Sequence, residues 1–440
     1  MDFLILVIQS LLTFISVNFY SATELFGLNI WWTIFPIIWC AIFFIKPIRK
    51  KSCFSNRLYV LKSSTQLLKV FIITSTASAL LLGYLIFFSD INGKDIVINT
   101  VMVLVAEFIL FWDGTIRLYT TSVQLGLKWR VIGIICGMIP VVNIYVLIKT
   151  IKIADEEYDF ECDKVELDNS RVKSEICKTK YPLLLVHGVF FRDFKYLNYW
   201  GRIPNALKIN GAEIFYGSQQ SADSVENCAK ELTEKIKQIV DETGCEKVNI
   251  IAHSKGGLDA RYAISCLGAD KYVASLTTVN TPHRGCQFAE YLLNKASDSF
   301  REFVSSKYNS ALKYLGDPDP DFISAVTDLT ACRCKELNEI CQNVSDVYYQ
   351  SVGSKVKKAT NGKFPLNLSY HLVKHFDGEN DGLVSVDSMK WGENFIFLTP
   401  KGKRGISHGD VVDLNRENIK GFDVREFYIN LVNDLKNKGY

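Results

Sequence analysis

Long apolar windows fill the first 150 residues of the chain, whereas short apolar runs separated by amphipathic stretches follow after residue 180. A helix that crosses a lipid bilayer needs about 20 predominantly apolar residues. Five windows approach this length: 3–20, 30–45, 70–88, 96–112 and 131–148. We therefore predict that residues 1–150 form a membrane anchor of about five transmembrane helices.

The positions of basic residues predict how this anchor is oriented. No Lys or Arg precedes Lys46, so the first window lacks the basic region of a secretory signal and is expected to be retained. Seven basic residues lie from Lys46 to Lys69, and cytoplasmic loops are enriched in Lys and Arg. With that loop inside and an odd number of spans, we expect the C-terminal part on the non-cytoplasmic side of the cell membrane.

One acidic residue, Glu107, falls inside the fourth window. Ionisable groups are costly within a bilayer, and those that occur there usually face protein or water and often serve a function. The sequence identifies no partner for Glu107. Glu107 could therefore belong to a functional site, or it could pair with a neighbouring helix.

An alternation of strands and helices characterises the chain beyond a polar linker at residues 151–180. Apolar runs typical of strands occur at 182–186, 213–216, 248–252, 275–279, 347–351 and 395–398, and the segment 225–241 has helical spacing. Strands separated by helices form βαβ units with a largely parallel sheet. We predict an α/β domain over residues 181–440.

The third predicted strand runs into a candidate nucleophile, Ser254, in the sequence AHSKGG. A serine on a sharp strand-to-helix turn needs small neighbours, because the backbone there is strained and approaches the adjacent strand closely. Ala252 stands where the G-x-S-x-G pattern has its first glycine, and Gly256 stands at the second. The motif in this context predicts a nucleophile elbow, although an ordinary tight turn would have a similar composition.

An acid and a base should follow such a serine in that order. Asp381 in the segment NDGLV and His408 in the segment SHGD complete the order with Ser254. The histidine would accept the serine proton, and the aspartate would orient the imidazole. The sequence leaves alternatives: Asp377 or Asp387 as the acid, and His371 or His375 as the base, the last two being spaced as a possible metal pair.

Backbone amides near Ser254 could stabilise the oxyanion of an acyl-transfer reaction. The segment His187-Gly188-Val189 follows the first predicted strand, and Lys255 follows the serine. One amide from each place would converge on the same oxygen. His187 as a general base is the less favoured interpretation, since a His-Gly pair at a strand end more often shapes a loop.

Composition and charge narrow the classes of function. The chain has 440 residues, 48% hydrophobic and 22% charged, which excludes disorder. Its net charge of +3 divides into +6 for residues 1–150 and −3 for the rest, which argues against nucleic-acid binding. Among the 12 cysteines, Cys332, Cys334 and Cys341 form the tightest group, but without a CxxC pair or a nearby His they do not predict zinc. We expect reduced thiols.

These motifs together resemble bacterial triacylglycerol lipases of the α/β-hydrolase fold, over roughly residues 180–435. The matching segments are LLLVHGV at 183–189, YWGRIP at 199–204, VNIIAHSKGG at 248–257, TPHRG at 281–285, NDGLV at 380–384 and SHGD at 407–410. The resemblance implies Ser254, Asp381 and His408 as the catalytic triad, with the Val189 and Lys255 amides as the oxyanion hole. It also implies a helical lid or cap at about 286–346.

The resemblance further raises the question of a calcium ion. Lipases of this group that contain calcium use an Asp two residues after the catalytic His, which matches Asp410, and a second Asp some twenty residues before the catalytic acid. Asn361 stands in that region instead. We therefore expect no required cofactor, and Asp410 could simply cap a helix.

We interpret the chain as a membrane-anchored serine hydrolase that cleaves carboxylic esters of lipids through an acyl-enzyme. Two alternatives remain: an acyltransferase acting on a cell-surface acceptor, and a noncatalytic membrane-assembly protein with a hydrolase-like module. The expected partners are a lipid or ester substrate and the membrane, and the sequence identifies no protein partner.

Overall fold

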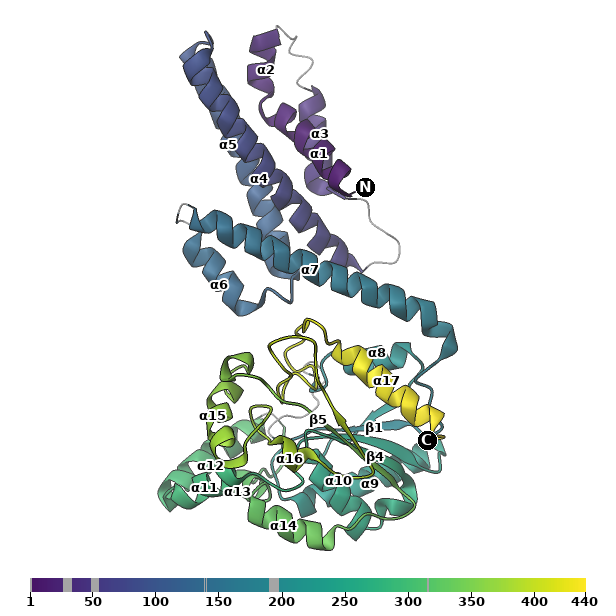
Figure 1. Cartoon of the computed structure of the whole chain (residues 1–440). Helices are drawn as coiled ribbons and strands as arrows, with labels where there is room; N and C mark the ends of the chain where they lie inside the picture. The colour runs from purple at the N-terminus through teal and green to yellow at the C-terminus, as the bar shows by residue number, and fades with distance from the viewer. Residues whose placement is uncertain are drawn as a thin grey trace. The chain divides into compact units, whose positions relative to one another are not determined.

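The computed structural model describes residues 2–26, 34–48, 55–137, 139, 141–189, 198–314 and 316–440. They divide into two compact units, Met1–Asn169 and Ser170–Tyr440, which are described separately (Figure 1). Three parts of the predicted anchor lie outside the described residues: the start of the second window, 30–33, residues 49–54 of the basic loop, and positions 138 and 140 of the fifth window.

Helices make up the described part of the N-terminal unit. They are α1 (Asp2–Val17), α2 (Phe19–Phe26), α3 (Ile34–Ile45), α4 (Asn56–Phe88), α5 (Gly93–Thr121), α6 (Gly126–Cys136) and α7 (Val142–Arg171). The long helices α4 and α5 pack against each other, and α1 packs against α4 (Figure 1). Gly114 permits the close approach of α4 and α5, because a Cβ atom at that position would lie 2.8 Å from Cγ of Leu68.

The described helices support the predicted membrane spans only in part. Among the described helices, α4 and α5 are long and apolar enough to cross a membrane, whereas α1 and α3 are apolar but have 16 and 12 residues. The window 131–148 is not one helix, since α6 ends at Cys136 and α7 begins at Val142. Gly137 and Pro140 stand between them, and both residue types disfavour a continuous helix. The predicted count of about five spans is therefore not confirmed.

Ion pairs attach the predicted linker to the N-terminal unit. Residues 151–171 belong to α7, so most of the segment 151–180 is helical. Asp155 of α7 pairs with Lys62 and Lys69 of α4, and Glu157 pairs with Arg57 at 2.5 Å. Glu157 also accepts hydrogen bonds from two backbone amides that follow α5. Arg57, Lys62 and Lys69 are among the basic residues from which the orientation of the anchor was predicted.

A six-stranded parallel sheet forms the centre of the C-terminal unit, as the sequence predicted. Its strands are β1 (Leu183–Val186), β2 (Ile214–Tyr216), β3 (Val248–His253), β4 (Val273–Val279), β5 (Tyr348–Gly353) and β6 (Asn394–Phe397), in the order β2-β1-β3-β4-β5-β6. In a parallel sheet the carboxyl ends of all strands lie at the same edge. Residues that directly follow the strands are therefore brought together.

Helices cover both faces of this sheet (Figure 1). Leu183 and Leu185 pack on one face with α8 (Ile203–Ile209) and α17 (Val424–Asn437). Leu184 and Val186 pack on the other with α9 (Val225–Thr243) and α10 (Gly256–Cys266). Alternate residues of a strand point to opposite faces, which explains why β1 is apolar throughout.

The segment between β4 and β5, where a lid or cap was predicted, is helical. It contains α11 (Gln287–Lys295), α12 (Asp298–Tyr314), α13 (Phe322–Thr327) and α14 (Ala331–Ile340), and α15 (Leu366–Asp377) and α16 (Val386–Met389) follow β5. The helices α13 and α14 are separated by three residues, 328–330. Thr330 begins the second, because its side chain accepts a hydrogen bond from the Arg333 amide.

Candidate active site

Ser254 lies at the turn between β3 and α10, with a backbone φ of 55°. A non-glycine residue in this left-handed region is uncommon, and strained positions of this kind concentrate at functional sites. The Ser254 amide donates to the Val279 carbonyl at 2.9 Å, which fixes the turn against the end of β4. The motif thus adopts the strand-turn-helix geometry that the sequence predicted.

Small residues around Ser254 allow close packing. A Cβ atom at Gly256 would lie 2.3 Å from the His187 carbonyl oxygen, and one at Gly257 would lie 2.2 Å from Oγ1 of Thr281. Ala252, the departure from the usual motif, is fully buried in β3 between Val186 and Thr278. The sheet therefore accommodates its methyl group.

The structure pairs Asp381 with His408. Oδ2 of Asp381 lies 2.7 Å from Nδ1 of His408, and Asp381 is fully buried. Oδ1 of the same carboxylate accepts hydrogen bonds from the Leu383 and Val384 amides at 2.8 Å. These bonds fix the carboxylate, so that it can orient the imidazole and stabilise its positive charge.

Asn280 also holds this carboxylate, and the sequence analysis missed it. Its Nδ2 atom donates to Oδ2 of Asp381 and to Oγ of Ser354, both at 2.7 Å. Asn280 directly follows β4 and has a φ of 47°, a conformation in which Asn is enriched. The feature of the sequence that could have identified Asn280 as a site residue is its position directly after a predicted strand.

The alternative acids and bases lie elsewhere. Asp377 accepts from the amides of Gln287 and Phe288, and Asp387 pairs with Lys390 at the surface. His371 and His375 belong to α15. Among the described residues, no group of three or more metal-ligating side chains occurs.

His253 links the serine turn to His408. The centroids of the two imidazole rings are 4.5 Å apart, and Nδ1 of His253 lies 2.5 Å from the Tyr199 hydroxyl. Burial, together with the neighbouring His408, lowers the pKa of His253 well below its usual value, so it stays neutral. The described residues contain no hydrogen bond between Ser254 and His408; in ligand-free enzymes such bonds are often long and tighten with substrate.

The predicted oxyanion segments meet at the serine. A Cβ atom at Gly188 would lie 2.8 Å from Cβ of Ser254, so the loop after β1 contacts the turn. Within the described part of the chain, the amides of Val189 and Lys255 have no hydrogen-bond partner. Nδ1 of His187 lies 2.8 Å from the Gly188 carbonyl oxygen and Nε2 lies 3.1 Å from that of Gln219. A neutral imidazole donates to one of the two, so His187 shapes this loop.

The Lys255 side chain is buried away from this role. Its ammonium lies 2.7 Å from Oδ1 of Asp259, and both side chains are almost fully buried. Burial by itself would lower the pKa of Lys255, but the Asp259 carboxylate reverses this effect and raises it. Lys255 can therefore contribute its amide to the site and not its charge.

Asp410, the residue for which a calcium-ligand role was considered, has side-chain and backbone partners in the structure. Its carboxylate accepts from the Ser407 amide at 3.0 Å and from Nη2 of Arg404 at 3.0 and 3.1 Å, and the same Nη2 contacts Glu417 at 2.8 Å. Burial raises the pKa of Asp410, and Arg404 opposes that shift. A guanidinium thus supplies the positive charge beside the carboxylates.

A parallel α/β sheet with a serine elbow and an Asp–His pair at its carboxyl edge defines an α/β-hydrolase fold. The model of the DUF676 serine esterase family matches residues 210–316. The triacylglycerol lipase of Vibrio cholerae serotype O1 is 33% identical over 239 residues, 49% of this chain and 76% of that protein. The triacylglycerol lipase of Pseudarthrobacter phenanthrenivorans is 33% identical over 181 residues, 36% of this chain and 53% of that protein.

The chain therefore belongs to the family of the triacylglycerol lipases, as its motifs predicted. It spans only about half the length of some curated relatives, as with the 53% in Pseudarthrobacter. Among solved structures, the mature Bacillus licheniformis lipase BlEst2 is 21% identical with a TM-score of 0.43, covering 58% of this chain and 92% of that one.

Proposed function

We propose that this protein is a membrane-anchored serine hydrolase that cleaves carboxylic esters of lipids. The observation that carries the proposal is the Asp381–His408 hydrogen bond of 2.7 Å, at the sheet edge where Ser254 occupies a left-handed turn. Family membership supports ester hydrolysis as the reaction.

The proposed reaction proceeds through an acyl-enzyme. His408 accepts the proton of Ser254 while Oγ forms a bond to the ester carbonyl carbon. The amides of Val189 and Lys255 stabilise the resulting oxyanion. When the intermediate collapses, the bond to the alkoxy oxygen breaks and His408 returns the proton to the leaving alcohol. Water, activated by the same histidine, then releases the acid and restores Ser254.

The substrate class and location follow from the N-terminal unit. Two described helices, α4 and α5, are long and apolar enough to cross a membrane. Anchoring there would hold the hydrolase domain next to lipid esters. With the basic loop before α4 in the cytoplasm, the domain lies on the non-cytoplasmic side if the number of spans is odd, as the sequence predicted. The relatives reported above are lipases, which does not favour acyl transfer or a noncatalytic role.

The contacts of Asp410 also support hydrolysis without a required metal ion, because Arg404 occupies the place of a cation beside this carboxylate. No step of the proposed reaction involves a metal.

Fluorophosphonate labelling followed by a lipid-ester screen tests the proposal. The purified full chain should react at Ser254 and should release fatty acid from one or more lipid esters. Ser254→Ala should lose both, with turnover lowered by several orders of magnitude, since triad members act as a unit. Thr281→Ser, a conservative change beside the elbow, serves as the matched control.

Two results would contradict the proposal. If purified Ser254→Ala kept more than about a tenth of the activity, Ser254 would not be the nucleophile, because an enzyme that loses its triad serine keeps far less activity. Transfer of the acyl group to an added alcohol in preference to water would instead indicate an acyltransferase with the same serine.

A further inference from the structure

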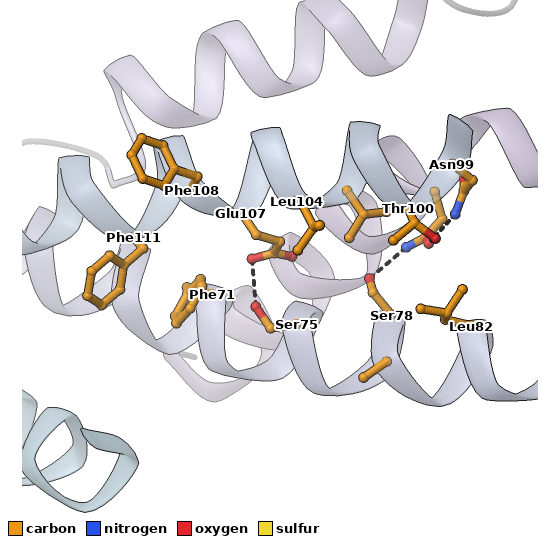
Figure 2. A pocket seen from close by; sticks show the side chains of 13 residues that line it. Phe71, Ser75, Ser78, Leu82, Asn99, Thr100, Leu104, Glu107, Phe108 and Phe111 are labelled. Carbon is orange, nitrogen blue, oxygen red and sulfur yellow. Dashed lines mark hydrogen bonds between the residues drawn. The ribbon is translucent and has the colours of Figure 1, made fainter. Parts of the chain in front are cut away.

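A cavity of about 420 Å³ lies in the N-terminal unit between α4 and α5, next to the junction of α1 and α2 (Figure 2). Its volume falls within the roughly 300–1,000 Å³ that is typical of small-molecule sites. It is lined by residues of this unit alone and is separate in sequence from the candidate active site.

Apolar side chains form most of the cavity wall. Phe71 and Phe111 lie toward one end, and Leu82 lies toward the other (Figure 2). Leu104 and Phe108 also line the cavity, yet they remain 63% and 64% exposed. If α5 crosses a bilayer, these two side chains face hydrocarbon. A ligand would therefore enter from the lipid and would carry an apolar chain.

Glu107 supplies an unused hydrogen-bond acceptor at this wall. Its side chain points from α5 toward Ser75 of α4, whose hydroxyl donates to Oε2 at 2.9 Å (Figure 2). Glu107 is only 6% exposed, and among the described residues its Oε1 atom has no hydrogen-bond partner. A buried acceptor left without a donor costs about 1–3 kcal/mol, and more when charged. A ligand that donates to Oε1 would remove this cost.

Three other polar residues of the cavity, Asn18, Ser78 and Asn99, are joined by hydrogen bonds. Nδ2 of Asn18 donates to Oγ of Ser78 at 2.8 Å, and Nδ2 of Asn99 donates to Oδ1 of Asn18 at 3.3 Å. The Ser21 amide donates to Oδ1 of Asn99. Asn18, Ser78 and Asn99 therefore link the helices by hydrogen bonds, whereas Oε1 of Glu107 can still accept a hydrogen bond from a ligand.

We propose that this cavity binds a neutral, hydroxyl-bearing single-chain lipid, such as a monoacylglycerol. One hydroxyl would donate to Oε1 of Glu107, and the chain would lie between Phe71, Phe111 and the exposed Leu104. A neutral alcohol suits this site better than an ammonium group, since moving a charge through hydrocarbon is costly. The choice of lipid rests on the proposed function, because hydrolysis of acylglycerols yields partial glycerides with free hydroxyls.

Photo-crosslinking tests this proposal without depending on catalysis. The probe is a 1-O-alkylglycerol with a diazirine in its alkyl chain, which has the hydroxyls of a monoacylglycerol but no ester. With the full chain in lipid nanodiscs, we expect saturable crosslinks in α4 and α5 that unlabelled 1-O-alkylglycerol displaces. Glu107→Leu should reduce crosslinking at least tenfold, whereas Thr76→Ala, an exposed change on α4 outside the cavity, should not.

A second variant keeps the test decisive if Glu107→Leu fails to fold. Ala79→Phe fills the cavity and leaves Glu107 in place, so it should also abolish crosslinking. Unchanged crosslinking in a folded variant of either kind would overturn the proposal. So would equal displacement by a chain-matched dialkyl ether without hydroxyls. Because the probe has no ester, loss of binding and loss of hydrolysis are measured independently.

Discussion

At the scale of single residues, the candidate site depends on how one carboxylate is held. Asp381 is fully buried and has four hydrogen-bond contacts, from His408, Asn280 and two backbone amides. Two of its neighbours in sequence, Asp377 and Asp387, have the same chemistry but contact a helix start and a surface lysine. Position in the fold, and not residue type, distinguishes the three.

We expect Asp381→Asn to lower kcat on a soluble short-chain ester by on the order of 10⁴-fold, because an amide no longer holds the histidine in its reactive tautomer. Asp377→Asn and Asp387→Asn should stay within about twofold of the parent, since neither contacts His408 in the structure. Steady-state kinetics of the three purified variants check this. An inactive Asp377→Asn beside an active Asp381→Asn would reassign the acid.

At the scale of elements, hydrogen bonds show which part of the lid region is held in place. The Asp321 amide donates to the Ala222 carbonyl at 2.7 Å, and the Val225 amide donates to Asp328 at 2.6 Å. Val189 of the oxyanion loop packs in one cluster with Leu312 and Ala325. In contrast, α12 leaves most of its aromatic side chains exposed. Leu312 belongs to the C-terminal end of α12, and α11 buries Phe288 and Ala289 in another cluster. We therefore infer that the N-terminal turns of α12 form the part that responds to lipid.

The exposed aromatic residues of α12 should matter at an interface and not in solution. Phe300 and Phe303 are each 59% exposed, and burial in lipid would contribute about 1.5–3 kcal/mol per side chain. Phe300→Ser with Phe303→Ser should therefore lower the rate on a lipid emulsion at least tenfold and leave the rate on a soluble ester unchanged. Ile209→Ser, an exposed apolar residue of α8, is the control. Equal losses on both substrates would indicate a structural defect.

The ion cluster after β6 predicts how the protein responds to chelators. Arg404 contacts both Asp410 and Glu417, so we expect EGTA to change neither ester turnover nor thermal stability. Arg404→Ala should instead lower the stability by about 1–3 kcal/mol, because it leaves buried Asp410 without its charged donor. Thermal unfolding with and without EGTA measures both effects. A fall in Tm on adding EGTA that calcium restores would show that a metal is bound.

At the scale of the whole molecule, two units with different surfaces are joined in one chain. The N-terminal unit exposes many large apolar side chains along α4 and α5, whereas the C-terminal unit buries its apolar residues on both faces of a sheet. Exposed apolar helices of this length require lipid or another partner. This contrast is the basis for proposing an anchored hydrolase.

We expect the full chain to remain in the membrane fraction after high-salt and alkaline washing, because apolar burial in lipid does not depend on charge. Protease added to intact cells should degrade the C-terminal unit if it lies on the non-cytoplasmic side. Protection until lysis would place it in the cytoplasm, which would mean that either the number of spans or the orientation of the basic loop was wrongly predicted. Release by high salt alone would argue against spanning helices.

The sequence alone predicted the parallel sheet, the strand-turn-helix geometry at Ser254, and Asp381 and His408 as the candidate acid and base. These features arise from local patterns: strand periodicity, small residues at a strained turn, and motifs close to strand ends. The sequence did not determine the number of spans, because the apolar window 131–148 does not show that α6 ends at Cys136 and α7 begins at Val142.

Only the tertiary structure decided which distant side chains meet. It chose Asp381 over its two neighbours, added Asn280, and placed Ser75 beside Glu107. It also gave the charge beside Asp410 to Arg404. These contacts join segments that approach one another only when the sheet and the helix bundle have formed. Their geometry depends on how the elements pack in three dimensions, and the periodicity of the sequence does not predict that packing.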